Sequence, residues 1–149
     1  MNENIIVLMD LDNFKDISNR MNWTRYSPNI ITGNLTELIK KLVRKYFGSI
    51  MWGMSKQEGT EECLILFTVT NLDNLLKDLK DLKRKVEELG KETGTNATIS
   101  IGVAIGKVID HKPARSRHSK DLYSDPLRKL AKRALNEAKK RGGNKIVIK

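Results

Sequence analysis

The feature that most constrains the fold is an apolar run near the N-terminus that ends in two carboxylates. Residues 4–12 read NIIVLMDLD, and the β-branched, near-continuous apolar run before Asp10 is typical of a central strand covered on both faces. Alternate residues of a strand point the same way, so Asp10 and Asp12 can share one face unless the chain turns at Asp12. Two carboxylates at the end of a buried strand require neutralisation, so this end of the strand is a candidate site.

The rest of the chain alternates between strand-like and helical periodicity. Strand-like periodicity covers residues 4–12, 49–55, 62–69, 96–106 and 144–148. Helical periodicity covers residues 14–21, 32–48, 71–94 and 126–141. The polar segment 56–61 predicts a β-hairpin. The order β-α-α-β-β-α-β-α-β is ferredoxin-like, so we expect one α+β domain over residues 1–149, with helices on one face of a mixed, mostly antiparallel sheet.

Positive charge is concentrated in the C-terminal third of the chain. The formal net charge is +10; residues 1–106 hold 14 basic and 14 acidic side chains, and residues 107–149 hold 14 and 4. Such a surface attracts the phosphates of nucleotides, RNA or anionic lipid, and a solvated lysine-rich surface explains it equally well. Residues 107–125 form a polar, basic loop of a length that indicates function or disorder.

Cysteine content and hydropathy indicate the compartment. Cys63 is the single cysteine, so an intramolecular disulfide is impossible, and the apolar runs are far shorter than the ~20 residues of a membrane span. The N-terminus lacks the pattern of a secretory signal. We therefore expect a cytoplasmic protein with no membrane association.

A second group of carboxylates is expected beside the first. In a ferredoxin-like sheet the strand over residues 4–12 neighbours the hairpin, whose turn carries Glu58, Glu61 and Glu62. Clustered carboxylates repel one another unless a cation neutralises them, and hard oxygen ligands suit Mg²⁺. Taken singly, Asp12 could cap the following helix and the glutamates could be exposed turn charges. Taken jointly, the two segments favour a metal site.

Four segments resemble the GGDEF and nucleotidyl-cyclase palm superfamily. MDLDNFKDISN resembles its first-strand segment, and GTEEC at 59–63 stands where that family has Gly-Gly-Asp/Glu-Glu-Phe. SIGVA at 100–104 and AKRALNEAKKRGGNKIVI resemble the end of the same domain. The resemblance implies a Mg²⁺- or Mn²⁺-dependent nucleotidyltransferase or cyclase that makes cyclic or linear products from nucleoside triphosphates, GTP or ATP, as a homodimer.

The resemblance also implies roles for individual residues. Asp10 and Glu61 would bind the metal ions together with the carbonyl of Leu11, and Glu62 would assist, so Asp10, Glu61 and Glu62 are the candidate catalytic residues. The residues that would contact the nucleotide are Asn13, Phe14, Lys15, Ser18, Gly59, Thr60 and Lys139.

The sequence departs from the family pattern at four positions. Thr60 replaces the second glycine and Cys63 the phenylalanine of the GGDEF segment, while Ser18 and Gly143 stand where diguanylate cyclases have Asn and Arg. These departures argue against cyclic di-GMP synthesis. They leave open another base, adenine included, and a catalytically degenerate domain that senses a nucleotide or cyclic dinucleotide.

Two further resemblances and the basic charge each suggest a different function. LDNF, residues 22–29 and the following helix also resemble archaeal GTP cyclohydrolase III, which would make the chain a ring-opening hydrolase. The minimal CRISPR polymerases resemble it in their single-domain size. The charge suggests a basic ferredoxin-like module that contacts RNA through its C-terminal third by phosphate contacts.

Overall fold

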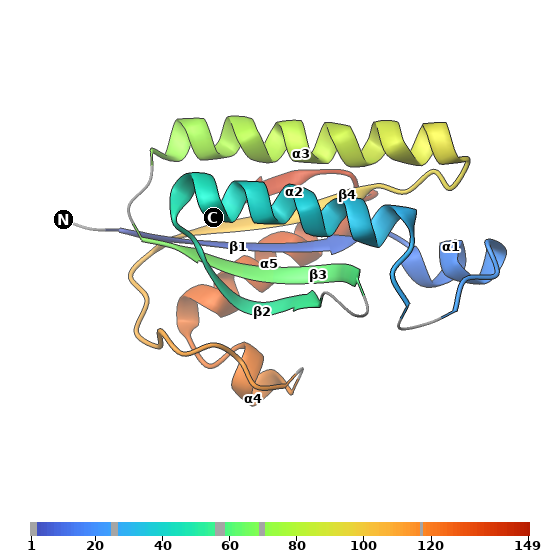
Figure 1. Ribbon diagram of the computed structural model, residues 1–149. Coiled ribbons are helices and arrows are strands. Elements are labelled where there is room, and N and C mark those ends of the chain that lie inside the picture. Colours follow the sequence, from blue (N-terminus) through green and yellow to red (C-terminus); the bar gives the residue numbers. More distant parts are fainter. Residues whose placement is uncertain (1–2, 25–26, 56–58, 69–70, 117) are drawn as a thin grey trace.

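The computed structural model describes residues 3–24, 27–55, 59–68, 71–116 and 118–149 (Figure 1). The strands are β1 (Asn4–Leu11), β2 (Ser49–Ser55), β3 (Gly59–Phe67), β4 (Ile99–Gly106) and β5 (Ile146–Ile148). The helices are α1 (Phe14–Arg20), α2 (Ile30–Tyr46), α3 (Leu72–Thr93), α4 (Ser119–Leu122) and α5 (Pro126–Lys140). The predicted order is confirmed, and the one addition is α4, a short helix inside the basic loop. None of the helices in these ranges is long and apolar enough to cross a membrane.

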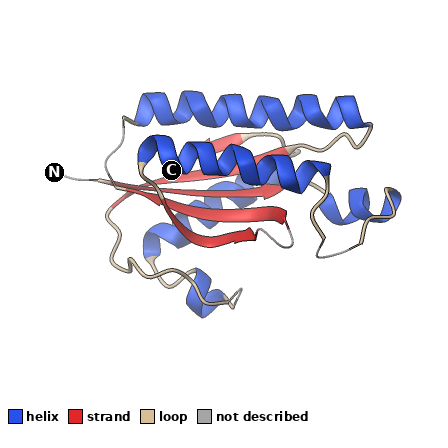
Figure 2. Ribbon diagram, in the orientation of Figure 1, coloured by secondary structure: helices blue, strands red, loops and turns tan. Residues whose placement is uncertain are grey.

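The strands form one sheet (Figure 2), and their order in it is β2-β3-β1-β4-β5. β1 lies at its centre and pairs antiparallel with both β3 and β4, whereas β4 and β5 run parallel. This arrangement confirms the predicted α+β fold with a mixed, mostly antiparallel sheet. The register places Asp10 of β1 between Glu62 of β3 and Ser100 of β4.

Helices cover both faces of the sheet, so the prediction of helices on one face is wrong. α2 and α3 pack on the face that carries Val7 and Met9, and α5 packs on the opposite face, which carries Ile6 and Leu8 (Figure 1). All four of these side chains are 0% exposed. A single helical layer would leave Ile6 and Leu8 in water, at a cost of roughly 2 kcal/mol for each side chain. The apolar run of β1 therefore requires two helical layers.

A glycine in β4 allows α5 to lie close to the sheet. A Cβ atom at Gly102 would lie 2.4 Å from the carbonyl oxygen of Ala131 and 2.4 Å from the backbone nitrogen of Leu135. A side chain at position 102 would therefore push α5 away from the strand. This contact explains the glycine in the SIGVA segment and fixes α5 over the centre of the sheet.

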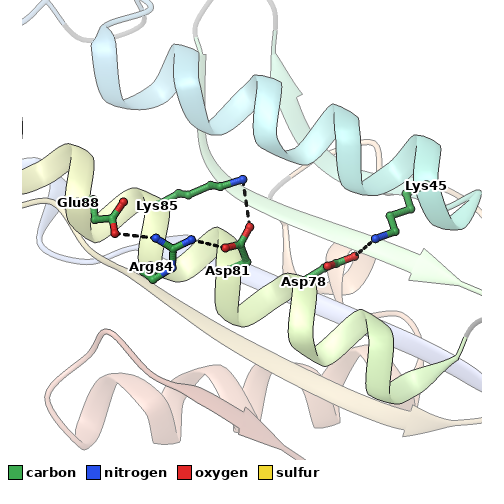
Figure 3. A network of polar contacts seen from close by, with 6 residues as sticks. All are labelled: Lys45, Asp78, Asp81, Arg84, Lys85 and Glu88. Atoms are coloured by element: carbon green, nitrogen blue, oxygen red, sulfur yellow. Dashed lines mark hydrogen bonds and ion pairs between the residues drawn. The ribbon is translucent and has the colours of Figure 1, made fainter.

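The charges of α3 lie on its outer surface and do not mark a site. Figure 3 shows Lys45 of α2 beside five charged side chains of α3, which are Asp78, Asp81, Arg84, Lys85 and Glu88. Lys45 crosses from α2 to Asp78, with 2.7 Å between Nζ and Oδ2. These pairs are largely exposed and contribute little to stability. The α3 charges are a solvated face of a helix that packs on the sheet.

Asp125 ties the basic loop to the start of α5. Its carboxylate accepts hydrogen bonds from the backbone N–H of Leu127 at 2.7 Å, of Ile109 at 2.6 Å and of Asp110 at 2.8 Å. The first of these bonds caps α5, and the other two hold the beginning of the loop against it. Asp125 is fully buried, so these donors replace the water that the carboxylate loses on folding.

Arg128 holds the middle of the same loop. Its guanidinium is fully buried and donates to the backbone carbonyls of Asp110, Lys112 and Asp121. One positive charge thereby connects three separated points of the loop to α5. Hydrogen bonds to Asp125 and Arg128 thus hold residues 107–116 and 118–125 against α5, although the basic composition alone suggested a solvated segment.

We expect Asp125→Ala to reduce the free energy of unfolding by about 3 kcal/mol, because it removes a helix cap and one of the carboxylates near the buried charge of Arg128. Chemical denaturation followed by circular dichroism measures the change. Asp121→Ala is the control, since Asp121 is exposed on α4. Equal losses in the two variants would contradict the role assigned to Asp125.

The same carboxylate predicts an acid-sensitive contribution to stability. Burial alone would raise the pKa of Asp125, but hydrogen bonds from the backbone of Asp110, Ile109 and Leu127 and the charge of Arg128 outweigh it and lower the pKa. The stabilisation is therefore complete above the ordinary aspartate pKa of about 4 and is lost as the pH falls through it towards the lowered value. We expect the unfolding free energy of Asp125→Ala to fall less steeply below about pH 4 than that of the unchanged protein, as measured by denaturation at each pH. Parallel curves would contradict the prediction.

Candidate functional site

Three oxygen atoms at the end of β1 surround one ammonium group. Nζ of Lys139 lies 3.1 Å from Oδ2 of Asp10, 3.3 Å from the carbonyl oxygen of Leu11 and 3.1 Å from Oδ1 of Asp12. We call these three oxygens the oxygen cradle. Two of them belong to predicted metal ligands, Asp10 and Leu11, and the third to the other carboxylate at the end of the strand. The cation that lies among them comes from the last turn of α5.

Asp12 is held in place by four donors. Its carboxylate accepts from Oγ1 of Thr98 at 2.8 Å, Oγ of Ser100 at 2.7 Å, the backbone N–H of Asn144 at 2.8 Å and Nζ of Lys139 at 3.1 Å. Burial alone would raise the pKa of Asp12, but these bonds outweigh it and lower the pKa. Asp12 is therefore an ionised structural carboxylate that joins β1, β4 and the end of α5.

The alternative in which Asp12 caps the first helix is wrong. The residue before α1 is Asn13, which has a left-handed backbone with φ of 50° and whose side chain makes no cap hydrogen bond. The backbone N–H of Asp12 donates to the carbonyl of Thr98 at 2.9 Å, so Asp12 still pairs with the chain leading into β4. Its side chain points to the face covered by α5, as the alternation in the sequence suggested.

Gly143 is required by its contact with Asp12. Its φ is +76°, and a Cβ atom at this position would lie 2.9 Å from Cγ of Asp12. The glycine lets the chain turn after α5 so that the N–H of Asn144 reaches the Asp12 carboxylate. The departure from the family at position 143 thus has a structural cause in this chain, since a larger residue would displace Asp12.

Asp10 lies opposite Glu62 in the sheet. Burial raises the pKa of Asp10, the charge and hydrogen bond of Lys139 oppose that rise, and the nearby Glu62 carboxylate adds to it. Oε1 of Glu62 accepts a hydrogen bond of 3.1 Å from the indole Nε1 of Trp52. The predicted approach of the two acidic segments is therefore confirmed for Asp10 and Glu62.

The GTEEC segment lies in β3, whereas the sequence placed it at the hairpin turn. Residues 56–58, with Glu58, are outside the described residues. Glu61 is exposed, and the register places Glu62 rather than Glu61 opposite Asp10. Among the residues that the structure describes, no group of three or more His, Cys, Asp or Glu side chains is arranged to hold a metal ion. The predicted role of Glu61 as a ligand stays a prediction.

The first two residues of this segment pack against α2. Thr60 is buried, and its hydroxyl lies 2.6 Å from that of Thr36. Gly59 has φ of +79°, and a Cβ atom there would lie 2.2 Å from Oγ1 of Thr32. The side chain of Thr60 therefore points to α2.

Cys63 takes a core position. It is 0% exposed, and burial, with a smaller effect of Glu62, raises the pKa of its thiol to about 12. The thiol is thus an uncharged core group that fills the position of the family phenylalanine.

The predicted nucleotide contacts around α1 are divided between core and surface. The ring of Phe14 is 6% exposed and packs against Trp23 at 6.0 Å between ring centroids, so its side chain is a core residue. Asn13 and Lys15 are exposed, and Ser18 is half-buried. Because Asn13 follows Asp12 directly, α1 begins beside the oxygen cradle. The roles assigned to these residues in nucleotide binding stay predictions.

Two residues near the oxygen cradle were not predicted from the sequence. Trp52, which holds Glu62, had no distinguishing pattern around it. Lys132 lies on α5 seven residues before Lys139, and its charge is a smaller influence that, like Lys139, opposes the rise in the pKa of Asp10 caused by burial. A spacing of seven is close to two helical turns, so this spacing could have indicated two lysines on one face of α5.

The oxygen atoms of the cradle are of the chemical type that binds a hard cation. Carboxylate and carbonyl oxygens are the ligands that Mg²⁺ prefers, and the oxygen cradle already holds a positive charge. Asp10 and the carbonyl of Leu11, with Glu62 opposite, would hold such an ion. A metal ion among these oxygens would repel the Lys139 ammonium.

The fold is that of GGDEF and nucleotidyl-cyclase palm domains, which confirms the resemblance in the sequence at the level of the fold. The coiled coil and GGDEF domain of DgcB from Caulobacter crescentus, in complex with c-di-GMP, is 18% identical; the match covers 99% of this chain and 70% of that one, with a TM-score of 0.64. The FimX GGDEF domain from Pseudomonas aeruginosa is 18% identical, with 99% and 81% covered and a TM-score of 0.63. The catalytic core of a rhodopsin-guanylyl cyclase, in complex with ATPalphaS, is 14% identical, with 91% and 72% covered and a TM-score of 0.57. The sequence matches no family model and no curated protein.

Gly143→Ala should destabilise the protein more than a glycine substitution with the same backbone strain. Gly94 is the matched control, because its φ of +73° is close to that of Gly143 and a Cβ atom there would have no neighbour within 4 Å. We expect Gly94→Ala to cost about 1 kcal/mol and Gly143→Ala about 1 to 3 kcal/mol more, since the added methyl group displaces Asp12. Chemical denaturation of both variants tests this, and equal costs would refute the contact.

Proposed function

We propose that the chain is a Mg²⁺- or Mn²⁺-dependent nucleotidyltransferase or cyclase that acts on nucleoside triphosphates. The observation that carries the proposal is the oxygen cradle of Asp10, Leu11 and Asp12, which lies opposite Glu62 and contains a cation. The palm fold supports the proposal because two of the similar structures are complexes with c-di-GMP and with ATPalphaS.

The residues around the oxygen cradle would have separate tasks. A bound divalent ion would stabilise negative charge on the attacking hydroxyl and on the leaving pyrophosphate. Asp10 and the carbonyl of Leu11 would hold that ion, with Glu61 or Glu62 as a further ligand. Trp52 would fix the Glu62 carboxylate, and Asp12 would fix the end of β1 through its four hydrogen bonds. Lys139 and Lys132 would neutralise the phosphates.

The local packing supports an enzyme despite the departures from the family sequence. Thr60 directs its hydroxyl to Thr36, Cys63 fills the core, and Gly143 makes room for Asp12. None of these three substitutions places a side chain in the oxygen cradle. They are therefore compatible with a working site, with GTP or ATP as the substrate.

A second copy of the chain is part of the proposal. Joining two nucleotides requires two bound triphosphates whose reacting atoms face each other. One palm domain offers one oxygen cradle, so a homodimer would bring two together. RNA contact through the basic C-terminal third remains a separate prediction.

The second candidate is a sensor that binds a nucleotide or cyclic dinucleotide without turnover. The observation that favours it is Lys139, whose ammonium group balances the charge of the oxygen cradle. A site with an internal cation can be stable and bind phosphates without performing chemistry. Nucleotide affinity without any product would distinguish the sensor from the enzyme.

Incubation with each of the four ribonucleoside triphosphates and Mg²⁺ or Mn²⁺ should yield a dinucleotide, oligonucleotide or cyclic product, separated by mass spectrometry. Asp10→Ala should lower the rate at least about a hundredfold, because charge stabilisation at the reacting phosphate depends on this carboxylate. Removal of divalent ions with a chelator should have the same effect. Asp73→Ala, which removes an exposed carboxylate on α3, is the control and should retain full activity.

The possible products separate the enzyme from the competing hypotheses. Triphosphates that bind but stay unchanged would favour the sensor, and a ring-opened base would favour the hydrolase resembling GTP cyclohydrolase III. Full activity in a folded Asp10→Ala variant would refute the proposed site. Circular dichroism of each variant establishes that the chain has folded.

A further inference from the structure

We propose that Lys139 is an internal counter-cation that occupies the oxygen cradle in the resting protein and that a divalent ion binds there only by displacing it. This inference rests on the proposed function, because it concerns the same site. The inference adds a competition between the Lys139 ammonium and the metal ion for the oxygen cradle. Metal binding would then depend on whether the displaced ammonium finds another favourable position.

The geometry supports occupancy by the ammonium group. Nζ of Lys139 lies 3.1 to 3.3 Å from all three oxygens of the cradle. Carboxylate and carbonyl oxygens at such distances form charge-assisted hydrogen bonds, which are stronger than those between neutral groups. A divalent ion would need the same oxygens, so the two cations cannot both occupy the cradle.

The two carboxylates depend on Lys139 to different degrees. Asp12 also accepts from Thr98, Ser100 and the backbone of Asn144, and these bonds remain if the lysine leaves. Asp10 is half-buried opposite Glu62, and its carboxylate lies 3.1 Å from Nζ of Lys139. Lys139 therefore balances the charge of Asp10 in the resting protein, and a divalent ion would take over that role.

The lysine can leave without a change in the fold. Its backbone belongs to α5, which is fixed against β4 by the close contact at Gly102. Its side chain is 31% exposed, and four methylene groups allow the ammonium to swing towards solvent. Lys132 lies on the same face of α5, so the displaced ammonium would join it beside bound phosphates.

A consequence is coupling between the metal ion and the triphosphate. A triphosphate near α5 would offer the displaced ammonium a new anionic partner, so it would lower the free energy needed to empty the cradle. By reciprocity, the metal ion would raise the affinity for the triphosphate by the same factor. The site would then take up the metal ion together with the triphosphate.

The first test measures Mn²⁺ binding to the nucleotide-free protein, by the electron paramagnetic resonance signal of free Mn²⁺. We expect Lys139→Met to bind Mn²⁺ with a Kd at least about tenfold lower than that of the unchanged protein, because a positive charge has been removed from the cradle. Lys140→Met removes the same charge from the next, exposed position and should change Kd less than about twofold. The Asp10→Ala variant measures how much Mn²⁺ binds elsewhere on the protein.

The second test uses the unchanged protein and does not depend on the folding of a variant. Acetylation of lysines by an activated ester is followed by mass spectrometry with and without saturating Mn²⁺. We expect Lys139 to react at least about threefold faster with Mn²⁺, because an amine that has left the oxygen cradle on its flexible stem is more accessible to solvent and to the reagent. Lys140 is the internal control and should react at an unchanged rate.

The outcomes distinguish this inference from the proposed function. Equal Kd values for Lys139→Met and the unchanged protein, or unchanged acetylation of Lys139, would overturn the competition even where nucleotide turnover persists. If neither the unchanged protein nor Lys139→Met binds more Mn²⁺ than Asp10→Ala does, both the competition and the metal site of the proposed function would be overturned. A tighter Kd together with faster acetylation would support it.

Discussion

The burial of β1 on both faces is the constraint on which the rest of the structure depends. Val7 and Met9 pack under α2 and α3, and Ile6 and Leu8 pack under α5. The alternation that buries Ile6 and Leu8 also directs Asp10 to the α5 side, where the last turn of the helix supplies Lys139. The packing of the core and the position of the candidate site are therefore two results of the same alternation along one strand.

Local patterns in the sequence were sufficient for the strands, the helices and their order, because periodicity depends only on neighbouring residues. They were insufficient where partners are distant in the chain, as with Thr98, Ser100 and Asn144 around Asp12. The buried charge of Arg128 could not be told apart from the exposed lysines around it. The single helical layer is wrong for another reason: the ferredoxin-like order of elements predicts helices on one face, whereas the apolar run over residues 4–12 is typical of a strand covered on both faces.

The two carboxylates at the end of β1 show how similar residues acquire different tasks. Asp12 has donors from β4, from the turn after α5 and from Lys139, so its position is fixed and its charge is balanced locally. Asp10 lies between Glu62 and Lys139, where the balance depends on a side chain that can move. A rigid carboxylate beside one whose partner is a flexible lysine would suit a site in which a metal ion exchanges with Lys139.

Three of the departures from the family sequence are each explained by a local contact in the structure. At positions 60, 63 and 143 the residue is explained by its neighbours: a hydroxyl on α2, the core, and the carboxylate of Asp12. Asp10 and Leu11 stand where the resemblance places the metal ligands, whereas positions 60, 63 and 143 differ from the family pattern. Under the proposal, chemistry at this site would depend on charge balance as well as on the family motif, because a divalent ion would have to compete with Lys139 for the same oxygens. A triphosphate, by accepting that lysine, would shift the balance towards the ion.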